Sequence, residues 1–182
     1  QQDSFDSPDL TKLSDHITET GIKDMAYQQE PESIIWAVLN DGSIVTLCID
    51  RKEGILAWGT QQPTVGTTYE SVEVIPNDLG VDEVWIVVNT GSNRYVESFD
   101  SSAPYGLASG ISATAGTTTD VWSGLDHLDG ETVEIVADGV IMPSQTVSSG
   151  QITLDRDASA VFIGLPSHAY VKTLSPEFFT KG

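Results

Sequence analysis

Residues 33–50 read SIIWAVLNDGSIVTLCID, two strand-forming runs joined by a turn signal. Residues 33–39 and 43–50 are rich in Ile, Val, Leu and Trp, which fit the pleated, half-buried surface of a sheet. Between them lies Asn40-Asp41-Gly42, and these residue types tolerate the positive φ angles of tight turns. The pattern predicts an antiparallel hairpin.

Two further strands flank this hairpin. Residues 22–27 form a short mixed run, and the segment 28–32 after it contains Pro31, which favours a loop. On the other side, residues 51–54 read as a turn and residues 55–60 as another strand. Four consecutive antiparallel strands within about forty residues are typical of one blade of a β-propeller.

The Trp-containing strand occurs twice. Ile35-Trp36-Ala37-Val38 returns as Val84-Trp85-Ile86-Val87, 49 residues later (36 to 85), and the same offset places Gly42 on Gly91. Residues 1–99 are therefore predicted to hold two four-stranded, blade-like modules, at about 22–60 and 71–99. In this arrangement each Trp can pack against the neighbouring sheet. The alternative is two unrelated hairpins of a β-sandwich.

One short helix is predicted before the first module, over residues 7–20. Ser7 can cap its N-terminus, Pro8 suits its first turn, and Gly21 can end it. An apolar stripe at helical spacing comprises Leu10, Leu13 and Ile17.

The chain changes character after residue 99. Residues 100–124 are dominated by Ser, Ala, Gly and Thr, and this composition predicts a linker or loop. Strand patterns return at residues 132–137, 152–154 and 160–165, with turn signals at Asp138-Gly139 and at residues 148–150. Residues 125–182 are thus expected to form a small β-sandwich or barrel and a tail. The predicted fold class is all-β.

Charge excludes several kinds of partner. The 182 residues include 27 acidic and 8 basic side chains, for a formal net charge of −19. Surfaces that coat nucleic acids or anionic membranes need Lys and Arg, so neither is expected. No apolar run approaches the ~18–20 residues of a membrane span. The single cysteine, Cys48, excludes an internal disulfide, and the start at Gln1 suggests a segment of a longer chain.

Catalytic motifs are not recognisable. A glycosidase needs two carboxylates roughly 5–10 Å apart across a cleft, with one pKa raised. The acidic clusters are expected to be solvated instead; they comprise Asp126, Asp129, Glu131, Glu134, Asp155 and Asp157. His16, His127 and His168 show no zinc spacing. Nucleophile-elbow, phosphate-loop and dinucleotide patterns are missing, so we predict no catalytic residues, no cofactor and no metal.

Several segments together resemble a known family. Residues 13–31 read LSDHITETGIKDMAYQQEP, and the similarity continues at residues 35–38, 41–42, 57–58, 70–76, 82–85, 94–97, 124–133, 137–139, 152–155 and 164–166. In order and spacing, these segments are similar to phage tail proteins of the tail-tubular or nozzle type of short-tailed phages. The chain departs from the family pattern at Gly59-Thr60, where His often follows the Trp, and over residues 60–68.

The resemblance implies a structural virion protein that is made in the host cytoplasm. Such proteins form a ring, commonly hexameric, below the portal and adaptor, so the implied partners are copies of the chain and neighbouring tail proteins such as the adaptor and fibres. DNA would pass through without specific binding, and acidic residues lining the bore would repel its phosphates. Phe178 and Phe179 are candidate contacts between copies.

Two alternatives remain open. One is a carbohydrate- or receptor-binding β module of a tail, for which Trp122, expected in a loop, is the candidate sugar platform. The other is a glycan-degrading tail enzyme, in which mutation of Asp126 or Glu131 should abolish activity.

Overall fold

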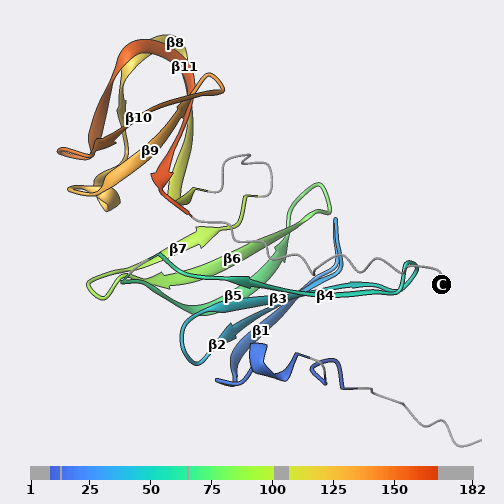
Figure 1. The fold of residues 1–182 in the computed structure, drawn as a ribbon. Helices are drawn as coiled ribbons and strands as arrows, with labels where there is room; N and C mark the ends of the chain where they lie inside the picture. The colour runs from blue at the N-terminus through green and yellow to red at the C-terminus, as the bar shows by residue number, and fades with distance from the viewer. Residues whose placement is uncertain (1–8, 13, 65, 101–106, 168–182) are drawn as a thin grey trace, which may run out of the picture. The chain divides into compact units, whose positions relative to one another are not determined.

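A computed structural model describes residues 9–12, 14–64, 66–100 and 107–167 of the chain. Antiparallel sheets make up most of this part, so the all-β prediction is confirmed (Figure 1). The chain divides into two compact units, Gln1–Ser101 and Ser102–Gly182. The helical elements within the described ranges are two 3₁₀ turns, η1 (Asp15–Ile17) and η2 (Asp126–Leu128).

The first sheet has four strands in chain order. They are β1 (Ile22–Gln28), β2 (Ile34–Leu39), β3 (Ile44–Asp50) and β4 (Ile55–Gln61), each antiparallel to the next. The predicted hairpin is present: Trp36 lies opposite Thr46, and Ala37 lies opposite Val45. Gly42 in the connecting turn has a φ of 84°, as the turn signal requires.

Within the described residues, the second sheet has three strands, where four were predicted. They are β5 (Thr68–Pro76), β6 (Asp82–Asn89) and β7 (Arg94–Ser98), again in chain order. The second module is therefore a shorter version of the first.

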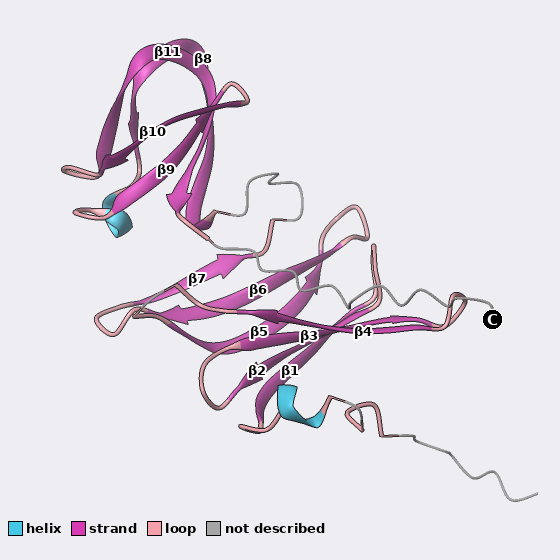
Figure 2. Cartoon of the chain, in the orientation of Figure 1, coloured by secondary structure: helices cyan, strands magenta, loops and turns pink. Residues whose placement is uncertain are grey.

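The two sheets of the first unit pack face to face (Figure 2). Val38 and Ile44 of the first sheet form one buried cluster with residues of the second sheet, namely Val72, Val84, Ile86 and Val88. Trp36 also faces the second sheet, and its ring lies 4.7 Å from that of Phe99 between centroids, at 31°. Each repeat thus buries its apolar face on the other, as expected for neighbouring modules.

The predicted helix over residues 7–20 is wrong. Residues 14–20 form only turns and the 3₁₀ turn η1, while Ser7, Pro8 and Leu13 lie outside the described residues. Asp9 Oδ1 accepts hydrogen bonds from the backbone N–H of Thr11 (2.8 Å) and from its hydroxyl (2.7 Å). Such local side-chain bonds compete with helical backbone bonds, and a short isolated helix is marginal.

The second unit is one strongly curved sheet. Its strands are β8 (Ala108–Ser123), β9 (Thr132–Ala137), β10 (Val140–Thr146) and β11 (Gln151–Leu165), in the order β10-β9-β11-β8. The register of β11 against β8 shifts between Thr153 and Ala160, and Figure 2 shows both long strands bending together. A core of aliphatic residues and Trp122 fills the concave side.

The predicted linker over residues 100–124 is also wrong for the residues that the structure describes, because 108–123 form β8. Ile111, Ala113 and Ala115 alternate toward the core, while Ser and Thr occupy the positions between them. This period of two is a strand signal that the small-residue composition obscured.

Candidate functional site

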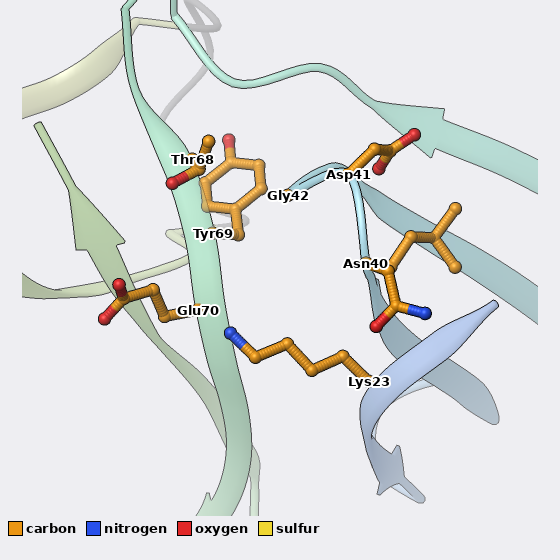
Figure 3. Close-up of a pocket in the computed structure, with 8 residues that line it drawn as sticks. Lys23, Asn40, Asp41, Gly42, Thr68, Tyr69 and Glu70 are labelled. Atoms are coloured by element: carbon orange, nitrogen blue, oxygen red, sulfur yellow. The ribbon is translucent and has the colours of Figure 1, made fainter. Parts of the chain in front are cut away.

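A shallow pocket lies where the two sheets of the first unit meet (Figure 3). Its volume is about 120 Å³. The start of β5 provides Thr68, Tyr69 and Glu70, the β2–β3 turn provides Asp41 and Gly42, and Lys23 extends toward β5 from β1. The pocket is too small for more than a few solvent molecules, so it does not suit an organic ligand.

Close backbone contact holds this junction together. The N–H of Tyr69 donates to the carbonyl of Gly42 at 2.8 Å. A Cβ atom at residue 42 would lie 2.6 Å from Thr68 Cβ, so the contact requires glycine. The junction is therefore a structural seam between the two sheets.

The two carboxylates of the pocket whose pKa is shifted favour the ionised form. Glu70 pairs with Arg94 (Oε2 to Nε, 2.7 Å) and accepts a bond from Asn89 at 2.8 Å. These contacts, Arg94 first, lower the pKa of Glu70. Hydrogen bonds from the Ser43 hydroxyl and backbone lower the pKa of Asp41. A general acid needs the opposite shift, so neither carboxylate suits that role.

Tyr69 is a pocket residue whose pKa is shifted mainly by burial. Burial raises the pKa of its phenol, and the negative charge of Glu97 adds to the shift. The neutral phenol packs against the cluster between the two sheets. It therefore acts as a core side chain.

Trp122 does not form a sugar platform. It lies in β8 rather than in a loop, and only 5% of it is exposed. Its ring belongs to the core of the second unit, and its Nε1 has no hydrogen-bond partner among the described residues. The expectation that it lies in an exposed loop is wrong because the surrounding Ser, Gly and Thr residues are strand residues here.

The acidic candidates of the second unit are all exposed, as expected for solvated side chains. Asp129 Oδ1 accepts a bond from the N–H of Gly150 at 3.1 Å, and a Cβ at Gly150 would collide with the carboxylate of Asp126. These two acids therefore fix the turn before β11. Glu131, Glu134, Asp155 and Asp157 lie on exposed positions of strands and turns.

Metal ligands do not gather in the part of the chain that the structure describes: it contains no group of three or more His, Cys, Asp or Glu side chains that could hold an ion. His16 lies on η1 of the first unit, while His127 Nε2 lies 2.8 Å from the carbonyl of Ser109 in the second. Cys48 is half-buried in β3. His168, Phe178 and Phe179 lie outside the described residues.

A partly exposed apolar face on the second sheet is the feature that sequence reasoning missed. Val84, Ile86 and Val88 face the first sheet, so the alternate residues of β6 face the other way. On that outer side a groove of about 270 Å³ is lined by Ile75, Trp85, Val87 and Val96, together with Ser71, Glu73 and part of Ile86. Ile75 is 50% exposed and Val96 is 69% exposed. We call this surface the Trp85 face.

The signal for this face was present in the sequence. Residues 84–88 read VWIVV, an uninterrupted apolar run, and such a run indicates a strand that is covered on both sides. Within the described residues of the first unit, another sheet covers only one side.

Comparison with known proteins does not assign the chain. A scan against models of known families finds none that matches, and a search of curated proteins finds no significant match. Within the described ranges, the chain forms no helix with the length and apolarity needed to cross a membrane.

Proposed function

We propose that the chain is a non-catalytic structural component of a phage tail, of the tube or nozzle type, which assembles with copies of itself into a ring around the path of the genome. The Trp85 face is the observation that carries this proposal. Exposed aliphatic side chains, here Ile75 and Val96, beside the half-buried Trp85 and Val87 on one sheet face are a feature of protein–protein interfaces. The family resemblance over residues 13–166 supplies the kind of assembly.

The distribution of acidic residues supports the same role. The acids at 126, 129, 131, 134, 155 and 157 are solvent-exposed, and the chain carries a net charge of −19. A conduit must let DNA slide, and carboxylates repel phosphates over a distance of about 8–10 Å in physiological salt. An acidic wall therefore lowers the affinity of the tube for its cargo.

The two alternatives receive less support. The sugar-binding hypothesis depended on Trp122, whose ring is buried. The glycan-degrading hypothesis depended on Asp126 or Glu131 in a groove, and both are exposed, with Asp126 next to the Gly150 turn. Neither alternative has a described site with the geometry that it requires.

Immunolabelling of intact particles tests the proposal. Antibodies raised against the purified chain should label one end of the tail of purified virions in electron micrographs. The matched control is the same antibody preparation after absorption with the purified chain. Particles that carry no label, together with no peptides of the chain in their mass spectrum, would contradict the proposal.

A further inference from the structure

The contact between the two sheets of the first unit shows how the Trp-bearing face of one sheet packs on another sheet. Trp36 and Val38 lie on the face of β2 that the second sheet covers, through residues such as Val84 and Ile86. Trp85 and Val87 stand 49 residues later (36 to 85) at the same positions of the repeat. The second sheet therefore repeats the Trp-bearing face of the first, but within the described residues of the first unit no further sheet packs on its copy of that face, where Ile75 and Val96 are exposed.

The internal contact also indicates what would cover the Trp85 face. Within the chain, Trp36 packs on the face of the second sheet that carries Val84 and Ile86. In the first sheet, the repeat places the equivalent face on the side that carries Ala37, opposite Trp36. The N-terminal segment covers part of that side, where Ile17 packs on a buried cluster that includes Val45. A strip of β1 stays uncovered there: Met25 is 60% exposed and Tyr27 is 54% exposed.

Residues adjacent to this strip are apolar as well. Met25 pairs with Ala37 across the sheet, and Tyr27 pairs with Ile35. We call Met25 and Tyr27, with their neighbour Ile35, the β1 strip. The β1 strip and the Trp85 face are different surfaces of the same unit, as a head-to-tail contact between identical copies requires.

We propose that the Trp85 face of one copy docks on the β1 strip of the next, so that copies join by repeating the sheet-on-sheet contact that each chain makes internally. This inference rests on the proposed assembly and names its surfaces. The contact is heterologous, so it can propagate around a ring.

Two substitutions and a mixing experiment on the full chain test this inference. Val96→Asp places a charge on the Trp85 face, and Met25→Asp places one on the β1 strip; both positions are exposed, so folding should be retained. Ile141→Asp is the matched control, since Ile141 is 79% exposed in the second unit. Circular dichroism and thermal unfolding report the fold, and sedimentation velocity over a concentration series reports assembly.

We expect the wild-type chain and Ile141→Asp to assemble alike. Val96→Asp and Met25→Asp should each weaken association by about tenfold or more, as the loss of roughly 1.4 kcal/mol or more implies. An equal mixture of the two variants should form a dimer, because Met25→Asp keeps an intact Trp85 face and Val96→Asp keeps an intact β1 strip.

Other outcomes overturn the inference in distinguishable ways. If Val96→Asp assembles like the wild type, copies join through another surface and the proposed function survives. If Val96→Asp is monomeric while Met25→Asp assembles fully, the Trp85 face pairs with itself or with another surface. A wild-type chain that stays monomeric throughout contradicts both this inference and self-assembly, whereas virion labelling still tests the presence of the chain in the tail.

Discussion

At the scale of single residues, the junction between the two sheets depends on a glycine and on a charged side chain. Only glycine fits at position 42, because Thr68 lies against it. The ionised form of Glu70 is stabilised by Arg94 and Asn89. Both roles lead to measurable expectations.

Gly42→Ala should destabilise the first unit by about 2–3 kcal/mol, because the new Cβ meets Thr68 and the φ of 84° disfavours any side chain. Gly54→Ala is the matched control: Gly54 also has a positive φ, 67°, but a Cβ added there would have no atom within 4 Å, so this variant should lose only about 1 kcal/mol. Urea unfolding of both variants measures the difference, and equal losses would show that the contact with Thr68 is unimportant.

Glu70 should make the free energy of unfolding of the first unit decrease at acidic pH. Its pKa is lowered in the folded chain, so its contribution is fully present above the unfolded value of about 4.5 and disappears as the pH falls through the lower folded value. Glu70→Gln should remove this part of the acid dependence and leave the neutral-pH fold intact. Denaturation at several pH values below neutrality checks it; an unchanged acid profile in Glu70→Gln would contradict the expectation.

Tyr69 should make the free energy of unfolding of the first unit decrease at alkaline pH. Burial and Glu97 raise the pKa of its phenol, so its stabilisation is complete below the unfolded value of about 10 and is lost as the pH rises toward the folded value. In a titration of tyrosinate absorbance, Tyr69→Phe should remove a step on the alkaline side of the curve. A titration that Tyr69→Phe leaves unchanged in shape would contradict this assignment.

At the scale of elements, strands were predictable where apolar runs alternate with turn residues. The run 33–50 specifies β2, its turn and β3, and Asp138-Gly139 specifies the β9–β10 turn, where both residues have positive φ. The fourth strand of the second module was expected from the repeat alone, and the described residues give this sheet three strands.

The errors over residues 7–20 and 100–124 have a common physical cause. Asp9 and Thr11 bond to each other locally, and β8 is held by its partner β11 rather than by its own propensity. Pairing with a strand some forty residues away leaves no mark on local composition. For the same reason the run 84–88 indicated a strand covered on both sides, but the sequence did not reveal which partner covers each side.

The alternation in β8 predicts how substitutions there should behave. Ala113→Asp should destabilise the second unit by about 2 kcal/mol, since Ala113 is partly buried against the core and a carboxylate there would lose part of its hydration. Thr114→Asp, one residue along on the exposed side, should change stability by about 0.5 kcal/mol or less. Thermal unfolding distinguishes the two variants, and equal effects would mean that this segment is not a packed strand in solution.

At the scale of the whole molecule, charge opposes association. Each copy carries −19, so bringing copies together costs electrostatic free energy that salt screens. Assembly should therefore strengthen as the ionic strength rises from 0.1 M, where the Debye length is about 10 Å, toward 1 M, where it is about 3 Å. Sedimentation velocity across this range measures the effect; assembly that weakens with salt would indicate attraction between charges at the interface instead.

The contact between Phe99 and Trp36 has a mechanical consequence. Phe99 follows the last strand of the first unit directly, and its ring lies against the other sheet. A pull transmitted through residue 100 reaches Phe99, whose ring contacts Trp36 and whose N–H donates to the carbonyl of Val84 at 2.9 Å, before it reaches the backbone bonds of β7. Tension on the chain would therefore load the ring contact and this hydrogen bond first, and the edge strand would separate only after both had broken.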